Sequence, residues 1–195
     1  MESLSLAFSS GWASGINAYL VVLVLGIADR VGDLEQVPDA LGRWEVLGAA
    51  AFMNAMEFVA DKIPYVDSGW DVVSTAIRPT AGAVIGVLIA GDAASLEQAV
   101  AGVVGGGTAL LSHLVKAGGR LAINSSPEPV SNIAASIAED LTVLAVVWFA
   151  IENPRAAAAI AGVLLVLGLG MLYVAARVVR RGWRRWRARR ERVPA

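Results

Sequence analysis

The chain has 195 residues, of which 56% are hydrophobic and 17% are charged, and its formal net charge is −1. That apolar share exceeds the roughly 45–50% of soluble domains, so the composition predicts an integral membrane protein. The absence of cysteine excludes disulfides, thiolate metal sites and cysteine nucleophiles. Nine of the sixteen lysines and arginines lie between Arg177 and Arg192, so an apolar, slightly acidic body is joined to a strongly basic end.

Six stretches of the sequence approach the length of about 20 apolar residues with which a helix crosses a bilayer. In chain order they are Gly11–Ala28, Arg43–Lys62, Trp70–Ala90, Leu96–Ala122, Val130–Ile151 and Arg155–Arg177. We expect Arg78-Pro79 to interrupt the third. We therefore predict an all-α fold, a polytopic membrane helix bundle of about six transmembrane helices, with one transmembrane domain over residues 1–180 and a basic cytoplasmic tail over residues 181–195. Three crossings before Ser95 and three after it would also suit a 3+3 inverted repeat.

The basic residues determine the expected orientation. An even number of crossings puts both termini on one side, and an excess of lysine and arginine marks the cytoplasmic side. The arginine-rich stretch 180–192 therefore predicts that both termini are cytoplasmic, together with the two polar, proline-containing turns at 63–69 and 124–129. The same stretch carries Trp183 and Trp186 among its arginines, which is also typical of a short helix that lies on anionic lipid.

Polar side chains within the apolar stretches recur three or four positions apart, a spacing that places them on one face of a helix. Four such faces are formed by Asn54, Glu57 and Asp61, by Asp71, Thr75 and Arg78, by His113, Lys116 and Arg120, and by Asn132, Ser136, Glu139 and Asp140. A charge at membrane depth costs about 2.5–3.5 kcal/mol or more, so a chain that keeps several there usually pairs them and uses them. We predict that Arg78 forms an ion pair with Glu139 or Asp140.

Most charged and amide side chains of these faces and of the two turns, together with Asn17 and Lys62, are the candidate lining of a substrate or ion pathway. They are Asn17, Glu57, Asp61, Lys62, Asp67, Asp71, Arg78, His113, Lys116, Arg120, Asn124, Glu128, Asn132, Glu139 and Asp140. The segment Ser14–Asn17 predicts either close helix packing or a local break that frees backbone groups to line a cavity. The glycines at 105–107 similarly indicate a hinge, a broken helix or a tight helix crossing.

Longer motifs extend through the body of the chain. They are SGINAYL at 14–20, EFVADKIPYVDSGWD at 57–71, IRP at 77–79, KAGGRLAINSSPEPVSN at 116–132 and the S-x-x-ED of Ser136–Asp140. Together they resemble a bacterial membrane family known as domain of unknown function 4126, over roughly Ser14–Trp148 and without the arginine-rich tail. The resemblance implies a multi-pass protein of the bacterial cytoplasmic (inner) membrane, and it implies no established activity.

Three classes of function remain open on these residues. A transporter or channel for a small ion, a metabolite or an anionic lipid head group fits the acidic and basic faces, with Glu57, Glu139 or Asp140 exchanging a proton. A structural or partner-binding membrane protein would use the same residues as buried ion pairs. A membrane-embedded enzyme acting on a phosphate-bearing lipid would need Mg²⁺ among the carboxylates, but the basic face with His113 favours an anion or an ion pair.

The usual catalytic spacings are absent, because the chain has a single histidine, no phosphate-binding loop and no G-x-S-x-G. We therefore expect no catalytic residues, no cofactor and no metal. The expected partners are the lipid bilayer and, at the arginine-rich tail, anionic lipids, with a homodimer as a further possibility and no nucleic acid.

Overall fold

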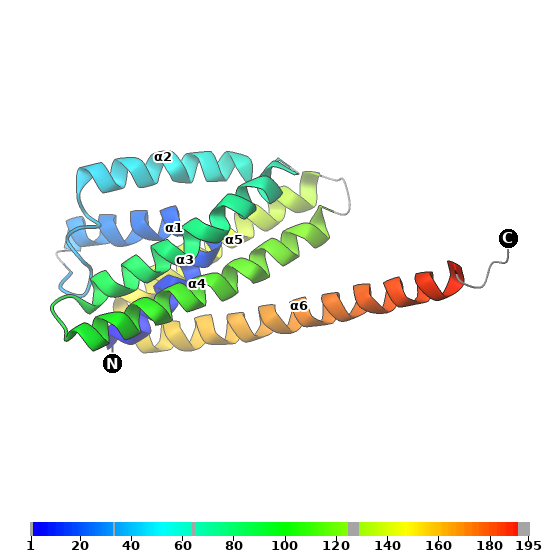
Figure 1. Cartoon of the computed structure of the whole chain (residues 1–195). Coiled ribbons are helices and arrows are strands. Elements are labelled where there is room, and N and C mark those ends of the chain that lie inside the picture. The colour runs from blue at the N-terminus through cyan, green and yellow to red at the C-terminus, as the bar shows by residue number, and fades with distance from the viewer. Residues whose placement is uncertain (1, 33, 64, 125–128, 191–195) are drawn as a thin grey trace.

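The computed structural model describes residues 2–32, 34–63, 65–124 and 129–190, and over these residues it is helical without strands. Its helices are α1 (Glu2–Gly32), α2 (Trp44–Ala60), α3 (Val66–Ala90), α4 (Ser95–Ile123), α5 (Pro129–Glu152) and α6 (Pro154–Arg190) (Figure 1). In the described part of the chain, five helices are long and apolar enough to cross a membrane. The exception is α2, whose 17 residues rise about 25 Å, against a hydrocarbon core of about 30 Å. The predicted all-α, polytopic bundle is confirmed.

Helix α1 lies at the centre of the bundle and is broken at Asn17, whose backbone is non-helical (φ −149°, ψ 95°). Its first half follows α4 in the same direction. Near its start, Thr108 Oγ1 donates to Phe8 O at 3.3 Å, and next to the break Lys116 Nζ donates to Ile16 O at 3.0 Å. The first half therefore ends in the middle of the bundle.

The second half of α1 returns to the end at which the first half began. It follows α5, and side chains of both helices line one apolar groove. Glu2 pairs with Arg155 at 3.3 Å, and Gln36, which follows α1 in the chain, donates to Ile151 O at 2.8 Å. Because Ile151 and Arg155 flank the junction between α5 and α6, both ends of α1 lie at one end of the bundle, which we call the N-terminal end.

This reversal corrects the predicted topology. Helices α2 to α6 alternate between the N-terminal end and the opposite end, beyond which α6 projects, and we call this second end the tail end (Figure 1). Glu2 and the last residues of α6 therefore lie at opposite ends, and the expectation that both termini share one side is wrong. Helix α4, the expected counterpart of α1 in a 3+3 inverted repeat, runs unbroken from Ser95 to Ile123, so the two halves of the chain differ in architecture.

Small residues allow the helices around α1 to approach closely. A Cβ added to Gly15 would overlap the backbone of Ala109 and the side chain of Ser112, and one added to Gly105 would overlap the backbone of Gly82. The sequence of Ser14–Asn17 predicted either close helix packing or a break in the helix, and the structure has both. Gly105 marks a tight crossing within a continuous helix, because α4 has no break there.

Two predicted boundaries are wrong. Helix α3 runs as one helix through Pro79, because the loss of a single backbone hydrogen bond is tolerated where α3 and α4 make the most extensive helix contact of the bundle. Helix α1 begins at Glu2 instead of Gly11, and its first turns, which include Leu6, are buried.

Apolar and polar side chains occupy different halves of the bundle. The hydrophobic core contains buried side chains from α1, α3, α5 and α6, among them Leu6, Val21, Leu25, Ile85, Ile89, Val143, Val147, Ile151 and Leu165. These residues belong to the turns near the N-terminal end. The buried charged side chains lie at the end of α2, in the first half of α3 and in the last turns of α4, so they lie toward the tail end.

Cysteine labelling can test the topology, because the chain has no cysteine of its own. We expect a membrane-impermeant maleimide to reach Ser3→Cys and Asp39→Cys from one side and Arg187→Cys from the other, since these exposed positions lie at opposite ends of the bundle. The measurement compares labelling in intact cells with labelling in inverted vesicles. If Ser3→Cys and Arg187→Cys reacted from the same side, the topology in which α1 folds back and α2 to α6 each cross the membrane would be wrong.

Candidate functional site

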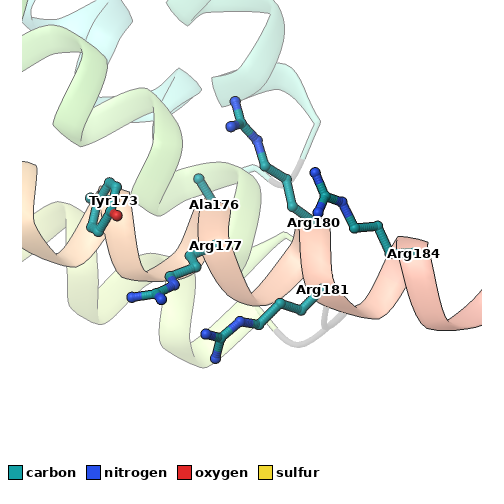
Figure 2. A pocket seen from close by; sticks show the side chains of 6 residues that line it. All are labelled: Tyr173, Ala176, Arg177, Arg180, Arg181 and Arg184. Atoms are coloured by element: carbon teal, nitrogen blue, oxygen red, sulfur yellow. The ribbon is translucent and has the colours of Figure 1, made fainter.

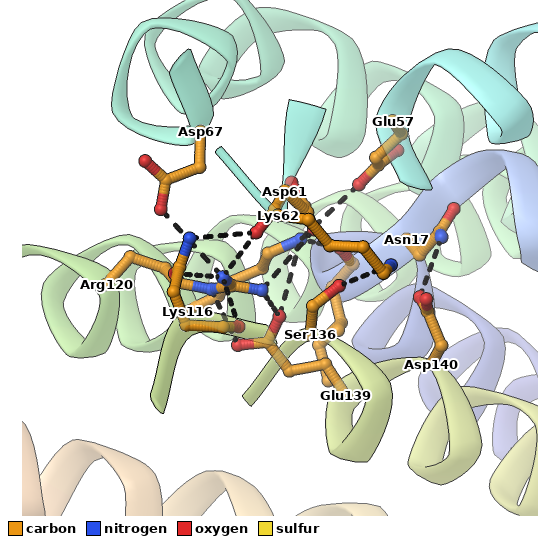
Figure 3. Close-up of polar contacts among 12 residues, drawn as sticks. Asn17, Glu57, Asp61, Lys62, Asp67, Lys116, Arg120, Ser136, Glu139 and Asp140 are labelled. Atoms are coloured by element: carbon orange, nitrogen blue, oxygen red, sulfur yellow. Dashed lines mark hydrogen bonds and ion pairs between the residues drawn. The ribbon is translucent and has the colours of Figure 1, made fainter. Parts of the chain in front are cut away.

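Charged side chains from α2, α3, α4 and α5, most of them buried, converge in the tail half of the bundle (Figure 3). We define the charge cluster as the residues that ion pairs join there: Glu57, Asp61, Asp67, Asp71, Arg78, Lys116, Arg120 and Glu139. All of their side chains except that of Glu139 are 7% exposed or less. The polar faces predicted from the spacing therefore turn inward.

Arg78 on α3 holds two carboxylates. Its Nη2 donates to Glu57 Oε1 at 2.7 Å, and its Nη1 donates to Asp71 Oδ1 at 3.1 Å. Nη1 also lies 2.8 Å from His113 Nδ1, and because arginine only donates, this nitrogen is an acceptor. The proton of the neutral imidazole then lies on Nε2, which donates to Thr75 Oγ1 at 3.0 Å. Arg78 thus also determines the tautomer of His113.

Lys116 on α4 joins carboxylates from two sides of the bundle. Its Nζ donates to Asp61 Oδ2 at 2.6 Å and to Glu57 Oε1 at 3.4 Å, near the end of α2. The same ammonium lies 3.6 Å from Glu139 Oε2 on α5 and donates to Ile16 O of α1. Lys116 therefore contacts three carboxylates and a backbone carbonyl with one charge.

Arg120, one turn further along α4, closes the cluster toward the tail end. Its Nη2 and Nε donate to the two carboxylate oxygens of Glu139 at 2.6 and 3.3 Å. This is a bidentate arginine–carboxylate pair. Its Nη1 donates to Asn132 Oδ1 at 2.6 Å and to Asp61 O at 2.9 Å. Asp67 Oδ2 lies 3.8 Å from the same nitrogen. This arginine therefore connects the beginnings of α3 and α5 to the end of α2.

The break in α1 supplies backbone acceptors to these cations. In a continuous helix the carbonyl of Ile16 would accept the amide of Leu20. That amide instead donates to Asn17 Oδ1 at 3.0 Å, and the carbonyl accepts Lys116. The preceding carbonyl lies 3.4 Å from Arg78 Nη1. Non-helical backbone is tolerated at membrane depth only where its polar groups find such partners.

The side chain of Asn17 extends from the break toward α2 and α5. Its Nδ2 donates to Asn54 Oδ1 at 3.1 Å and to Asp140 Oδ1 at 3.0 Å. Lys62 lies at the edge of this region, where its Nζ donates to Ser136 Oγ at 3.3 Å. The break therefore contacts Asp140, a carboxylate that lies beside the charge cluster and takes no part in its ion pairs.

Carboxylates outnumber cations in the charge cluster, since five of them share three cations. Asp67 is stabilised separately, because it lies in the first turn of α3, where the helix dipole favours a negative charge, and accepts two bonds from Asn124. Deeper inside, Glu57 Oε2 and Asp61 Oδ1 are buried without a hydrogen-bond partner among the described residues. An uncompensated buried charge costs several kcal/mol, so this arrangement favours a bound proton or cation.

Access to the charge cluster is one-sided. The side chain of Glu139 is 23% exposed, whereas that of its partner Arg120 is 1% exposed, and neighbouring Asp140 and Lys62 are half-buried. A cavity of about 130 Å³ between α3 and α4 also reaches Asp71. In the other direction, the apolar core fills the bundle up to the N-terminal end.

Most of the predicted pathway residues come together. Eight form the charge cluster, and Asn17, His113, Asn124, Asn132 and Asp140 bond to it or beside it. Lys62 contacts only its edge, and Glu128 lies outside the described residues.

The predicted pairing of Arg78 with Glu139 or Asp140 is wrong. Arg78 pairs with Glu57 and Asp71, while Glu139 pairs with Arg120 and Asp140 accepts a bond from an asparagine. The reason is the position of α1, which packs extensively against both α3 and α5.

Sequence reasoning missed the backbone acceptors of Gly15 and Ile16, because a carbonyl has no residue-specific signal. It placed Asn54 and Ser136 on polar faces but left them out of the site. The Mg²⁺ site considered for an enzyme has no counterpart in the described part of the chain, where no three histidine or carboxylate side chains are arranged to hold a metal ion.

The fold and the site define a polytopic membrane helix bundle with a broken central helix and a buried network of paired charges. A family model described as Domain of unknown function (DUF4126) matches residues 4–174, and the chain belongs to this family. The match extends the region of resemblance on both sides and ends before Arg177, so the arginine-rich tail lies outside it. No curated protein and no solved structure matches the chain.

Proposed function

We propose that this protein is a secondary transporter that couples the movement of a small ion or metabolite to protons bound in the charge cluster. The observation that carries the proposal is the sharing of three buried cations by five carboxylates beside the break in α1. Ionisable groups inside a membrane protein commonly mark proton relays and substrate pathways. An anionic lipid head group fits this site less well, because the cluster already holds more carboxylates than cations.

The broken helix supports the same proposal. Transporters commonly use discontinuous helices whose unwound carbonyls and helix ends coordinate substrates or coupling ions. Here Ile16 O accepts Lys116 Nζ, and a carbonyl that bonds a lysine side chain can exchange that partner for another cation. A carbonyl within a continuous helix lacks this freedom, since its partner is the amide four residues further on.

The one-sided access supports an alternating-access cycle. In the conformation described here Glu139 is partly exposed in the tail half, and apolar side chains fill the bundle toward the N-terminal end. We propose that the tail end faces the bacterial cytoplasm, because the excess of arginine in the tail favours that side. The opposite conformation would require α1 to separate from α5 within the apolar core.

Proton flux in liposomes tests the proposal. The reconstituted protein should acidify or alkalinise liposomes that contain a pH-sensitive dye when a gradient of Na⁺, K⁺ or inorganic phosphate is imposed. Glu57→Gln and Glu139→Gln should abolish this flux, because each removes a carboxylate that can carry the proton. Glu45→Gln and Glu152→Gln are matched controls on α2 and α5, are exposed and should retain it.

A structural or partner-binding role is the alternative, and the density of ion pairs in the charge cluster favours it. In that case the charges would only specify how the helices pack. This role would be supported if liposomes that contain the wild-type protein stayed impermeable to protons under gradients of Na⁺, K⁺ and inorganic phosphate. Equal loss of flux in the test and control variants would likewise contradict a proton pathway through Glu57 and Glu139.

A further inference from the structure

Four arginines on α6 surround a cavity of about 410 Å³ beyond the bundle (Figure 2). We call them the arginine face: Arg177, Arg180, Arg181 and Arg184. Their spacing of three and four residues puts them on one side of the helix. Arg180 and Arg184 project along one edge of the cavity, and Arg177 and Arg181 along the other (Figure 2).

Among the described residues, the arginine face lacks the carboxylate partners that Arg43 and Arg155 have. Within the described part of the chain, no ion pair joins its four guanidiniums to a carboxylate, whereas Arg43 pairs with Glu45 and Arg155 pairs with Glu2. Like charges three or four positions apart destabilise a helix. An anion bound between the two pairs of arginines would relieve this repulsion.

The position of the arginine face along α6 corresponds to a layer of lipid head groups. Arg177 lies 23 residues after Pro154, which is about 35 Å along a helix and slightly more than the roughly 30 Å of hydrocarbon. Leu172 lies against Gly118 of α4, and the arginine face begins just over one turn later. Tyr173, at its inner edge, is a residue type enriched at membrane interfaces.

We propose that the arginine face binds the phosphate of an anionic phospholipid in the leaflet at the tail end. A guanidinium donates two parallel hydrogen bonds to phosphate oxygens, and the two pairs of arginines present such donors along both edges of the cavity (Figure 2). The exposed Val163 and Val166 lie on the same side of α6 by their spacing and provide the surface for an acyl chain. A phospholipid matches both features, whereas free phosphate or a nucleic acid matches the charge alone.

Native mass spectrometry of the full chain, released from detergent micelles, tests this site. Micelles supplemented with phosphatidylglycerol should yield a retained lipid adduct, and micelles with phosphatidylcholine should yield little. Arg177→Gln/Arg181→Gln should weaken phosphatidylglycerol retention by about fivefold for each arginine, which corresponds to about 1 kcal/mol of attraction per basic residue. The site is separate from the charge cluster, so the result is independent of the proposed transport.

Arg43→Gln/Arg155→Gln is the matched control, because it removes the same charge from two exposed arginines at the N-terminal end and should leave retention unchanged. Equal retention of both lipids, or equal loss in the two double variants, would overturn the proposal. Displacement of phosphatidylglycerol by millimolar inorganic phosphate would also overturn it, since the ligand would then be a free anion. Displacement by a short oligonucleotide would assign the face to nucleic acid instead.

Discussion

Replacing Arg78 by methionine should lower the free energy of unfolding by about 3–5 kcal/mol, the cost of removing one partner from a buried ion pair. Arg78 is 1% exposed and binds Glu57 and Asp71, so its loss leaves two carboxylates without their cation. The imidazole of His113 loses its donor as well. Methionine fills a similar volume, so the loss should come from charge more than from packing.

Titration with sodium dodecyl sulfate in mixed micelles would measure this loss as a lower unfolding midpoint. The double variant Arg78→Met/Glu57→Gln should recover part of the stability, because it removes one of the two unpaired charges. Arg43→Met is the control, since Arg43 is 70% exposed and its surface pair contributes about 0–1 kcal/mol. If the double variant were no more stable than Arg78→Met, the pair with Glu57 would not stabilise the fold.

Alanine at Gly15 should destabilise the protein by about 1–3 kcal/mol, the usual result of adding atoms to a packed interior. Its Cβ would overlap the backbone of Ala109 and the hydroxyl of Ser112, and a backbone cannot move aside as a flexible side chain can. Helix α1 would have to shift away from α4, which would also separate Ile16 O from Lys116. We therefore expect Gly15→Ala to disturb the charge cluster as well as the packing.

Gly107→Ala provides the matched comparison, because no atom lies within 4 Å of the position that its Cβ would take. In a helix this change stabilises by about 0.5–1 kcal/mol, so the two variants should shift the thermal unfolding temperature in opposite directions. Hydrogen exchange would separately report whether α1 and α4 loosen together in Gly15→Ala. A Gly15→Ala protein as stable as the wild-type protein would mean that α1 and α4 are not in close contact at Gly15.

The inward faces of the helices were predictable from sequence because they depend on local geometry. A helix turns once every 3.6 residues, so the spacing of Glu57 and Asp61, or of Lys116 and Arg120, places each pair on one face whatever surrounds the helix. The high apolar content likewise predicted helices that cross a membrane, since only such segments satisfy their own backbone within lipid. Helical spacing and apolar content were therefore enough to predict most of the residues of the charge cluster.

The choice of ion-pair partners depended on the tertiary structure. Arg78 had carboxylates at suitable depth on α2, α3 and α5, and periodicity alone did not distinguish among them. Because α1 packs against both α3 and α5, Arg78 pairs with Glu57 and Asp71 and not with a carboxylate of α5. The backbone acceptors at Gly15 and Ile16 became available for the same reason, because α1 is broken beside them.

The sequence by itself determined that this protein is a helical membrane protein with buried polar faces, and the tertiary structure decided its topology. Hydropathy is the same whether α1 crosses the membrane or folds back, so the apolar residues on both sides of Asn17 predicted one crossing. The direction after the break is determined by contacts of the first half with α4 and of the second half with α5. Because these contacts join residues about 100 or more positions apart, no local pattern contains them.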